Sequence, residues 1–163
     1  MVGCGATGNP GEAWPRLPAR LWLDGYRRAL AGMGLFGAAK GWPRSDAPIE
    51  VDVFMMPGCI REGGERSSLA YDMLVFDTSS GMILDTQVLD PRPGLSVMWG
   101  SVAAMLLRML ARVQVLPSEV RVHSPLHFAV LQALGSQLGF TVALQAAPAV
   151  DKAREEMLSW FRG

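Results

Sequence analysis

The sequence EVRVHSPLHFAVLQALGSQLGFTVAL, residues 119–144, decides the fold class of this chain. Its ends, residues 119–123 and 140–144, are short apolar runs typical of buried strands, and a helical pattern lies between them. Ser124-Pro125 is a typical helix start, with serine as N-cap and proline in the first turn, and Gly139 suits the helix end. A strand, a helix and a second strand predict a right-handed crossover between parallel strands of one sheet.

Three further strands are expected before this unit, at residues 49–56, 69–76 and 82–89. The first alternates apolar and polar residues, which is the period of an extended chain, and Pro57 should end it. Residues 77–81, DTSSG, join the other two strands as a hairpin turn in which glycine can adopt a positive φ. These three strands therefore predict an antiparallel meander.

Helices are expected at three other places. Ser96 should cap a helix to Val113 that is apolar nearly all round, a second should run from Val150 to Phe161, and a third from Pro18 to Gly32. The predicted fold is α/β: a five-stranded mixed sheet, with a three-strand antiparallel meander followed by two strand–helix units, and an extra N-terminal helix. We expect residues 1–48 to form an irregular arm and helix packed on an α/β domain at 49–163.

The predicted core combines residues of the helix at 96–113 with the strand at 119–123. We expect five buried side chains there: Trp99, Met105, Leu106, Val120 and Val122. Trp160 also lies on a helix face that should belong to the core. Trp14 and Trp42, each beside a proline, either pin the N-terminal arm to the domain, which we favour, or present a contact surface for a partner.

The composition is that of a compact domain with a large core. Half of the 163 residues are hydrophobic, 18% are charged, and the 15 basic and 15 acidic residues cancel, which excludes a disordered chain. Nucleic-acid binders usually carry a basic excess, so the net charge does not support such a partner. The two cysteines, Cys4 and Cys59, are too few for a disulfide scaffold and are typical of a reducing compartment.

No stretch of the sequence has the pattern of a membrane span. Leu95–Leu107 is uncharged, but its 13 residues are fewer than the roughly 18–20 that cross a bilayer. Val122–Val150 is also uncharged, but prolines and glycines divide it into short elements. Residues 1–4 leave no room for the apolar run of a lipoprotein signal. We therefore expect a cytoplasmic protein with no membrane partner.

Four short segments together resemble a known family. They are LVFDTSSGMIL at 74–84, LPSEVRVHSP at 116–125, LGFTV at 138–142 and APAVDKA at 147–153. Over about residues 70–157 they look like a family of uncharacterised bacterial domains. Because that family has no assigned activity, the resemblance implies a fold and no reaction. The order of strands and helices over residues 49–161 is also similar to the ribonuclease H-like topology.

The ribonuclease H-like resemblance implies a specific set of residues. Its enzymes hold two divalent metal ions with carboxylates, because phosphoryl transfer requires both the attacking and the leaving oxygen to be neutralised. The first strand offers Asp52, and the last helix offers Asp151 and Glu155. The helix at 96–113 has no acid, and the fourth strand ends in His123 where an acid is needed. Acidic residues therefore occupy two of the four positions at which these enzymes carry metal-binding carboxylates. Asp52 and Asp151 could equally be ordinary surface acids.

Other motifs favour structural roles. His123 and His127 have the spacing of a zinc pair on one helix, but His123 precedes the helix, so we expect ordinary, partly buried histidines. Ser124 and His127 lack the glycine-flanked elbow of a catalytic triad. Residues 3–8, GCGATG, match a dinucleotide fingerprint without the required strand and helix around it. Residues 77–81 have the residue types of a turn more than those of a phosphate site.

The sequence favours a non-catalytic binding or protein-interaction module, with no cofactor, no metal and an unknown protein partner. The alternative is a divergent metal-dependent phosphoryl-transfer enzyme of nuclease type that uses Asp52, Asp151 and Glu155. The predicted N-terminal helix has an apolar stripe that includes Trp22. It either covers one face of the sheet in a monomer or pairs two copies in a homodimer. We favour the monomer, because a mixed sheet needs cover on both faces.

Overall fold

The computed structural model describes residues 34–60 and 68–163. The predicted helix at 18–32 and the glycine-rich residues 3–8 lie outside this range. The described elements are, in chain order, α2 (Leu35–Ala39), β1 (Arg44–Ser45), β2 (Ile49–Ile60), β3 (Ser68–Asp77), β4 (Met82–Leu89), α3 (Leu95–Val113), β5 (Leu116–Pro117), β6 (Glu119–Val122), α4 (Pro125–Leu138), β7 (Thr141–Leu144) and α5 (Pro148–Arg162).

The main sheet has five strands in the order β4-β3-β2-β6-β7. β2, β3 and β4 pair antiparallel, and β6 and β7 add parallel strands on the side of β2. The structure thus confirms the predicted α/β class, the meander and the two strand–helix units. A small second sheet, in which β1 pairs with β5 in parallel, was not predicted.

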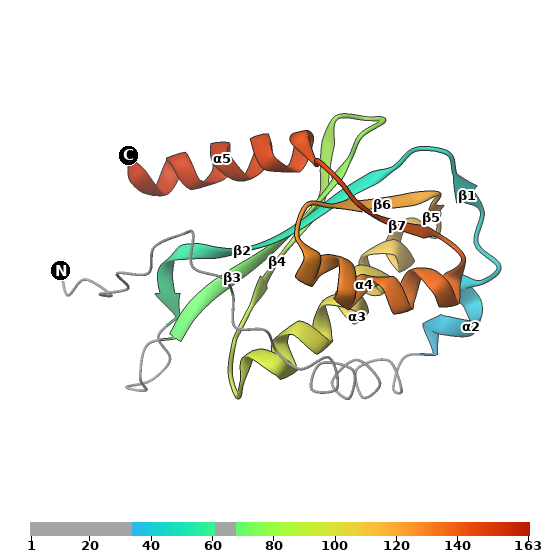
Figure 1. Cartoon of the computed structure of the whole chain (residues 1–163), viewed down its shortest axis with the longest axis horizontal. Coiled ribbons are helices and arrows are strands. Elements are labelled where there is room, and N and C mark those ends of the chain that lie inside the picture. The colour runs from blue at the N-terminus through green and yellow to red at the C-terminus, as the bar shows by residue number, and fades with distance from the viewer. Residues whose placement is uncertain (1–33, 61–67) are drawn as a thin grey trace.

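Helices cover both faces of the main sheet. Figure 1 shows α5 on the opposite side of the sheet from α3 and α4. Val51 and Val53 of β2 belong to the large apolar cluster with α3 and α4, while Phe54 packs with Val150 and Ala153 of α5. Successive strand residues point to opposite faces, so the even-numbered residues of this part of β2 face α5.

α3 is the central core helix. Ten residues of this helix are buried, and Trp99 and Leu106 are among them, as predicted. Val120 and Val122 of β6 are also buried, as predicted. Met105 is only partly buried against the same core. Within the described residues α3 is also the one helix whose length and composition would allow a membrane span. Its buried side chains are those expected of a core helix in a globular domain.

The predictions for Trp42 and Trp160 had different outcomes, and Trp14 lies outside the described residues. Trp42 is partly buried against the core, which confirms that it pins its segment to the domain. Trp160 is 83% exposed near the end of α5, so its assignment to the core was wrong. The apolar contacts of α5 with the sheet come from earlier positions of the helix, such as Val150 and Ala153.

Several predicted element ends differ from the structure; α5, for example, begins at Pro148 and not at Val150. β2 continues past Pro57 to Ile60, with a register shift between Met55 and Cys59. Only Ile49 and Glu50 of β2 pair with β6, so proline falls where β2 needs no hydrogen bond on that side. α3 begins one residue before Ser96, with Gly94 as N-cap and no side-chain cap.

The turn and cap predictions around β3 and α4 are confirmed. Gly81 has the positive φ expected for the turn, 71°. The Asp77 carboxylate accepts hydrogen bonds from the backbone N–H groups of Ser79 and Ser80, so these N–H groups already have an anionic partner within the turn. At the start of α4 the Ser124 hydroxyl accepts from the Leu126 N–H. Gly139 ends α4 with a φ of 78°.

Candidate functional site

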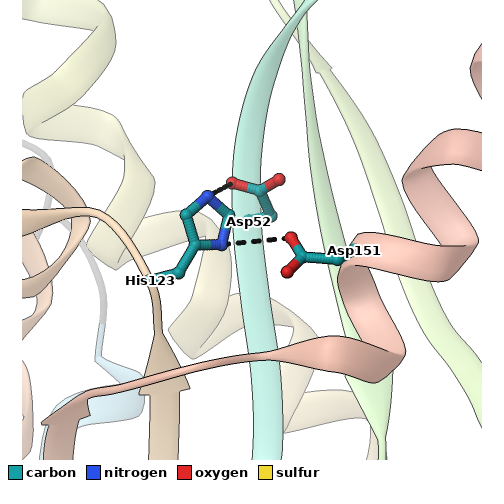
Figure 2. Close-up of side chains that lie close together, drawn as sticks. All are labelled: Asp52, His123 and Asp151. Atoms are coloured by element: carbon teal, nitrogen blue, oxygen red, sulfur yellow. Dashed lines mark ion pairs between the residues drawn. The ribbon is translucent and has the colours of Figure 1, made fainter.

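A cluster of charged and imidazole side chains lies where β6 ends beside β2. Glu50 of β2 is level with Arg121 of β6 in a parallel pairing, which places Asp52 level with His123, the first residue after β6. α5 brings Asp151, in its first turn, to the same place. Figure 2 shows the three side chains Asp52, His123 and Asp151 converging from these separate elements.

The imidazole ring of His123 lies between the two carboxylates, as Figure 2 shows. Its Nε2 is 3.6 Å from Asp52 Oδ1, and its Nδ1 is 3.3 Å from Asp151 Oδ1. One ligand atom from each of the three residues can be chosen so that all lie within 4.8 Å of one another. Asp52 is 1% exposed, whereas the side chains of His123 and Asp151 are about one-third exposed, so the cluster opens to solvent on their side.

Arg154, one turn further along α5, ties the two aspartates together. Its Nη1 donates a hydrogen bond of 2.5 Å to Asp52 Oδ2, and its Nη2 lies 3.3 Å from Asp151 Oδ1. A buried carboxylate requires a counter-charge, and this guanidinium supplies it for Asp52. The two oxygens of the Asp52 carboxylate therefore have different partners: Oδ2 accepts the hydrogen bond from Arg154, and Oδ1 faces His123.

His127, in the first turn of α4, faces the same oxygen from the interior. The residue is 4% exposed, and its Nδ1 lies 3.5 Å from Asp52 Oδ1 without a hydrogen-bond partner. The Trp99 ring packs against the imidazole at a centroid distance of 5.6 Å. Burial lowers the pKa of His127 to about 4, although Asp52 acts in the opposite direction. The ring is therefore neutral at pH 7.

Glu50 is a second buried carboxylate of β2, and it acts at the start of α5. Its Oε2 accepts a hydrogen bond of 2.8 Å from the Val150 N–H. The N-cap residue of α5, Ala147, has no side chain that can do this. Glu50 thus caps α5 from the sheet, where the partial positive charge of a helix N-terminus favours an anion.

The structure brings together two of the three predicted acids. Asp52 and Asp151 converge, and Asp52 is not the surface acid that the sequence suggested. Glu155 does not converge with the two aspartates: it is exposed, pairs with Arg162 at 3.3 Å, and contacts the cluster only through Arg154 Nε at 3.8 Å. α3 contributes no acid, as the sequence predicted, and His123 occupies the position at the end of the fourth strand.

Sequence reasoning missed the roles of Arg154, Glu50 and His127. A signal for Arg154 existed, because it follows Asp151 by three residues on one helix, a spacing that pairs opposite charges. Two acids on the same face of a strand that also carries Phe54 were a second signal. His127 was expected to be an ordinary, partly buried histidine, and nothing local indicates that its buried nitrogen faces Asp52.

The fold and the cluster together define an α/β domain with a buried aspartate–histidine site between its first long strand and two helix starts. The chain belongs to the family described as a domain of unknown function, DUF6930, whose family model matches residues 38–158. The resemblance to an uncharacterised family is therefore confirmed over a longer span than the sequence motifs covered. No curated protein sequence matches the chain.

Proposed function

We propose that this domain is a non-catalytic protein-interaction module that binds an extended segment of a partner protein along β4. The observation that carries the proposal is the exposed outer strand of the sheet. β4 is eight residues long, and Met82 and Val88 are 64% and 65% exposed. No other strand in the described part of the chain pairs with its outer side. An apolar outer strand of this kind is a template for another strand.

The sequence of β4 lacks lysine and proline, two of the residues that usually protect an edge, although the strand has a register shift between Ile83 and Asp85. Between Met82 and Leu89 it has neither proline nor lysine, and its one charged residue, Asp85, pairs with Arg112 of α3 at 3.2 Å. Exposed edge strands commonly carry lysine, proline or bulges that prevent pairing with other chains. The absence of lysine and proline from β4 supports a strand that pairs with a partner.

A depression beside β4 could take a side chain of the same partner. It has a volume of about 220 Å³, and Leu84 of β4 lines it together with Leu110 and Val113 of α3. Ser45 and Asp77 add polar groups to its wall. In strand addition, backbone hydrogen bonds supply affinity and such pockets supply specificity for alternate side chains. An apolar side chain of the partner fits this pocket best.

The alternative is a divergent phosphoryl-transfer enzyme of ribonuclease H-like fold. The strand order of the sheet and the convergence of Asp52 with Asp151 favour it. Its chemistry needs two divalent ions, which bring four positive charges. Asp52, Asp151 and Arg154 leave one net negative charge when both histidines are neutral, and Arg154 already holds one oxygen of Asp52. A cluster with one net negative charge is poorly suited to two divalent ions, which favours the interaction module over a two-metal enzyme.

Site-specific crosslinking in the producing cells tests the binding proposal. A photoreactive residue replaces Val88 of β4 or, as the control, Glu156 on the exposed side of α5. We expect a discrete adduct with another protein from position 88 only, and its loss when Ile83→Lys is added. Adducts with a second copy alone, or equal adducts from both positions, would contradict the proposal.

Hydrolysis assays test the enzyme alternative. Wild-type protein and Asp52→Asn are incubated with single- and double-stranded nucleic acids in Mg²⁺ or Mn²⁺. We expect equal background rates for both proteins. A metal-dependent rate that Asp52→Asn abolishes would establish the alternative.

We also propose that the module acts in the cytoplasm, which localisation of the tagged chain tests.

A further inference from the structure

We propose that Asp52, His123 and Asp151 bind one divalent first-row transition-metal ion, with Mn²⁺ as the test ion. The three residues come from β2, from the position after β6 and from the first turn of α5. β3 separates this site from β4, and the proposal depends neither on a protein partner nor on hydrolysis. The site differs from the predicted set Asp52, Asp151 and Glu155, because it holds one ion and includes an imidazole.

The distances between the ligand atoms suit a single ion. One ligand atom of each of the three residues lies within 4.8 Å of the other two, and no other group of three acidic, histidine or cysteine side chains in the described residues meets this limit. Two ligands bound to one ion at about 2.0–2.2 Å are at most about 4.4 Å apart. The side chains of His123 and Asp151 are 33% and 39% exposed, so both have room to move closer to the buried Asp52.

The buried imidazole of His127 points to a ligand at Asp52 independently of this grouping. His127 is 4% exposed, and its Nδ1 lies 3.5 Å from Asp52 Oδ1 without a hydrogen-bond partner among the described residues. Its ring centroid is 6.1 Å from that of His123, so His127 is not itself a ligand. Buried polar atoms are normally paired, and a water molecule on an ion at Asp52 would be a donor for this nitrogen.

A second buried atom of the cluster also lacks a hydrogen bond. Asp151 Oδ1 has no hydrogen-bond partner within the described part of the chain, although His123 Nδ1 and Arg154 Nη2 each lie 3.3 Å away. A carboxylate oxygen without a hydrogen bond keeps its lone pairs available for a cation. The two unpaired atoms, on His127 and Asp151, therefore lie on two sides of the same cluster.

Arg154 limits the site to one ion. Its guanidinium donates a hydrogen bond to Asp52 Oδ2 and leaves Oδ1 facing His123. Asp52, Asp151 and Arg154 together leave one net negative charge when His123 is neutral. One divalent ion changes this to one positive charge, whereas a second ion would place three positive charges in a partly buried cluster. Burial of uncompensated charge is costly, so the second ion is disfavoured.

The donor set selects the class of ion. Calcium and magnesium prefer oxygen ligands alone, whereas imidazole suits first-row transition metals, and manganese also accepts carboxylates. Three protein ligands leave coordination positions for water on the exposed side of His123, where the ion can enter. Because the ligands come from three elements, the ion would join the start of α5 to the sheet and stabilise the folded state.

Electron paramagnetic resonance of free Mn²⁺ in the presence of the full chain tests the site. Mn²⁺ is chosen because thiolates are soft ligands that suit other metals, so the two cysteines do not interfere. We expect one Mn²⁺ per chain. His123→Gln and Asp151→Asn change partly exposed residues and should weaken binding at least about 10-fold, since even outer-shell residues have effects of that size. Glu156→Gln, which removes an exposed acid of the same helix, should bind as the wild type does.

Two further readouts separate coordination from indirect effects. An imidazole nitrogen bound to Mn²⁺ modulates its electron spin echo, and His123→Gln should remove this modulation. Saturating Mn²⁺ should raise the unfolding midpoint of the wild type but not that of His123→Gln. Absence of Mn²⁺ binding at millimolar concentration, or binding that His123→Gln and Asp151→Asn leave unchanged, would overturn the proposal. None of these results depends on crosslinking at β4 or on the hydrolysis assays.

Discussion

The two faces of the five-stranded sheet are covered in different ways. On one face α3 and α4 bury a large apolar cluster that includes Trp99, Leu106 and Leu131. On the other face α5 packs on a small apolar cluster, and the strands beneath it carry the buried carboxylates Glu50 and Asp52. These two carboxylates accept hydrogen bonds from α5: Glu50 from the Val150 N–H and Asp52 from the Arg154 guanidinium.

Because of this difference, the two faces of the sheet have different roles: one stabilises the fold and the other positions polar side chains. An apolar interface gains free energy in proportion to the area it buries. A buried carboxylate needs a partner in a fixed place, so it gains little stability but fixes geometry. The α3–α4 face therefore stabilises the domain, and the α5 face positions the Asp52 cluster. Four substitutions test this comparison.

The largest effect is expected on the apolar face. Leu106 of α3 is fully buried, and Leu106→Ala should lower the free energy of unfolding by about 2–5 kcal/mol, since it removes apolar contacts and leaves a cavity. Denaturant unfolding measures this change. A loss below about 0.5 kcal/mol would mean that α3 is not the core helix.

On the α5 face, removal of one charge should matter more than removal of both. Arg154→Met leaves Asp52 buried without its counter-charge and should cost about 2–3 kcal/mol, less than a fully buried pair because the Arg154 side chain is 22% exposed. The double variant Asp52→Asn with Arg154→Met should recover part of this loss. Equal losses for the single and the double variant would contradict a coupled pair; thermal or denaturant unfolding distinguishes the two cases.

A third test concerns the contact of α4 with β7. A Cβ atom at Gly135 would lie 2.7 Å from the Phe140 carbonyl oxygen, so Gly135→Ala should destabilise the domain by about 1–2 kcal/mol. Gly37→Ala is the matched control, because nothing lies within 4 Å of a Cβ at that helical position. If the two variants unfold at the same denaturant concentration, α4 and the residues that lead into β7 are not packed as closely as described.

The smallest effect is expected at Asp72 of β3. This buried carboxylate accepts a hydrogen bond of 2.8 Å from the Thr86 hydroxyl, and burial raises its pKa. A raised pKa in the folded state means that ionisation at neutral pH costs stability, and that stability returns as the pH falls through the folded pKa. Asp72→Asn should therefore be neutral or up to about 1 kcal/mol stabilising at pH 7.

The pH dependence checks the sign of this effect. The advantage of Asp72→Asn over the wild type should shrink as the pH falls through the folded pKa of Asp72 and vanish below 3.8, the pKa of an unperturbed aspartate. Unfolding curves of both proteins from pH 7 to pH 3 measure the difference. An advantage that grows on acidification would show that the carboxylate is stabilised in its charged form.

The sequence by itself determined the five strands of the main sheet and the helices α3, α4 and α5, with most of their ends to within two residues. Alternation in β2, the DTSSG turn and the Ser124-Pro125 and Gly139 signals act over a few residues, because hydrogen bonding, proline geometry and glycine φ are local properties. The parallel addition of β6 and β7 followed from the crossover rule alone. Trp160 shows the limit, because whether an apolar helix position is buried depends on where the sheet ends beneath it.

Only the tertiary structure decided the candidate site. Arg154 and Asp52 are 102 residues apart, and Glu50 meets Val150 across 100 residues. The sequence named Asp52, His123 and Asp151 as separate candidates but could not bring them together. Their distances depend on the register between β2 and β6 and on the place where α5 starts over the sheet. Register is set by the packing of many side chains at once, so no local pattern could determine that Oδ1 of Asp52 faces two imidazoles while Oδ2 is held by Arg154.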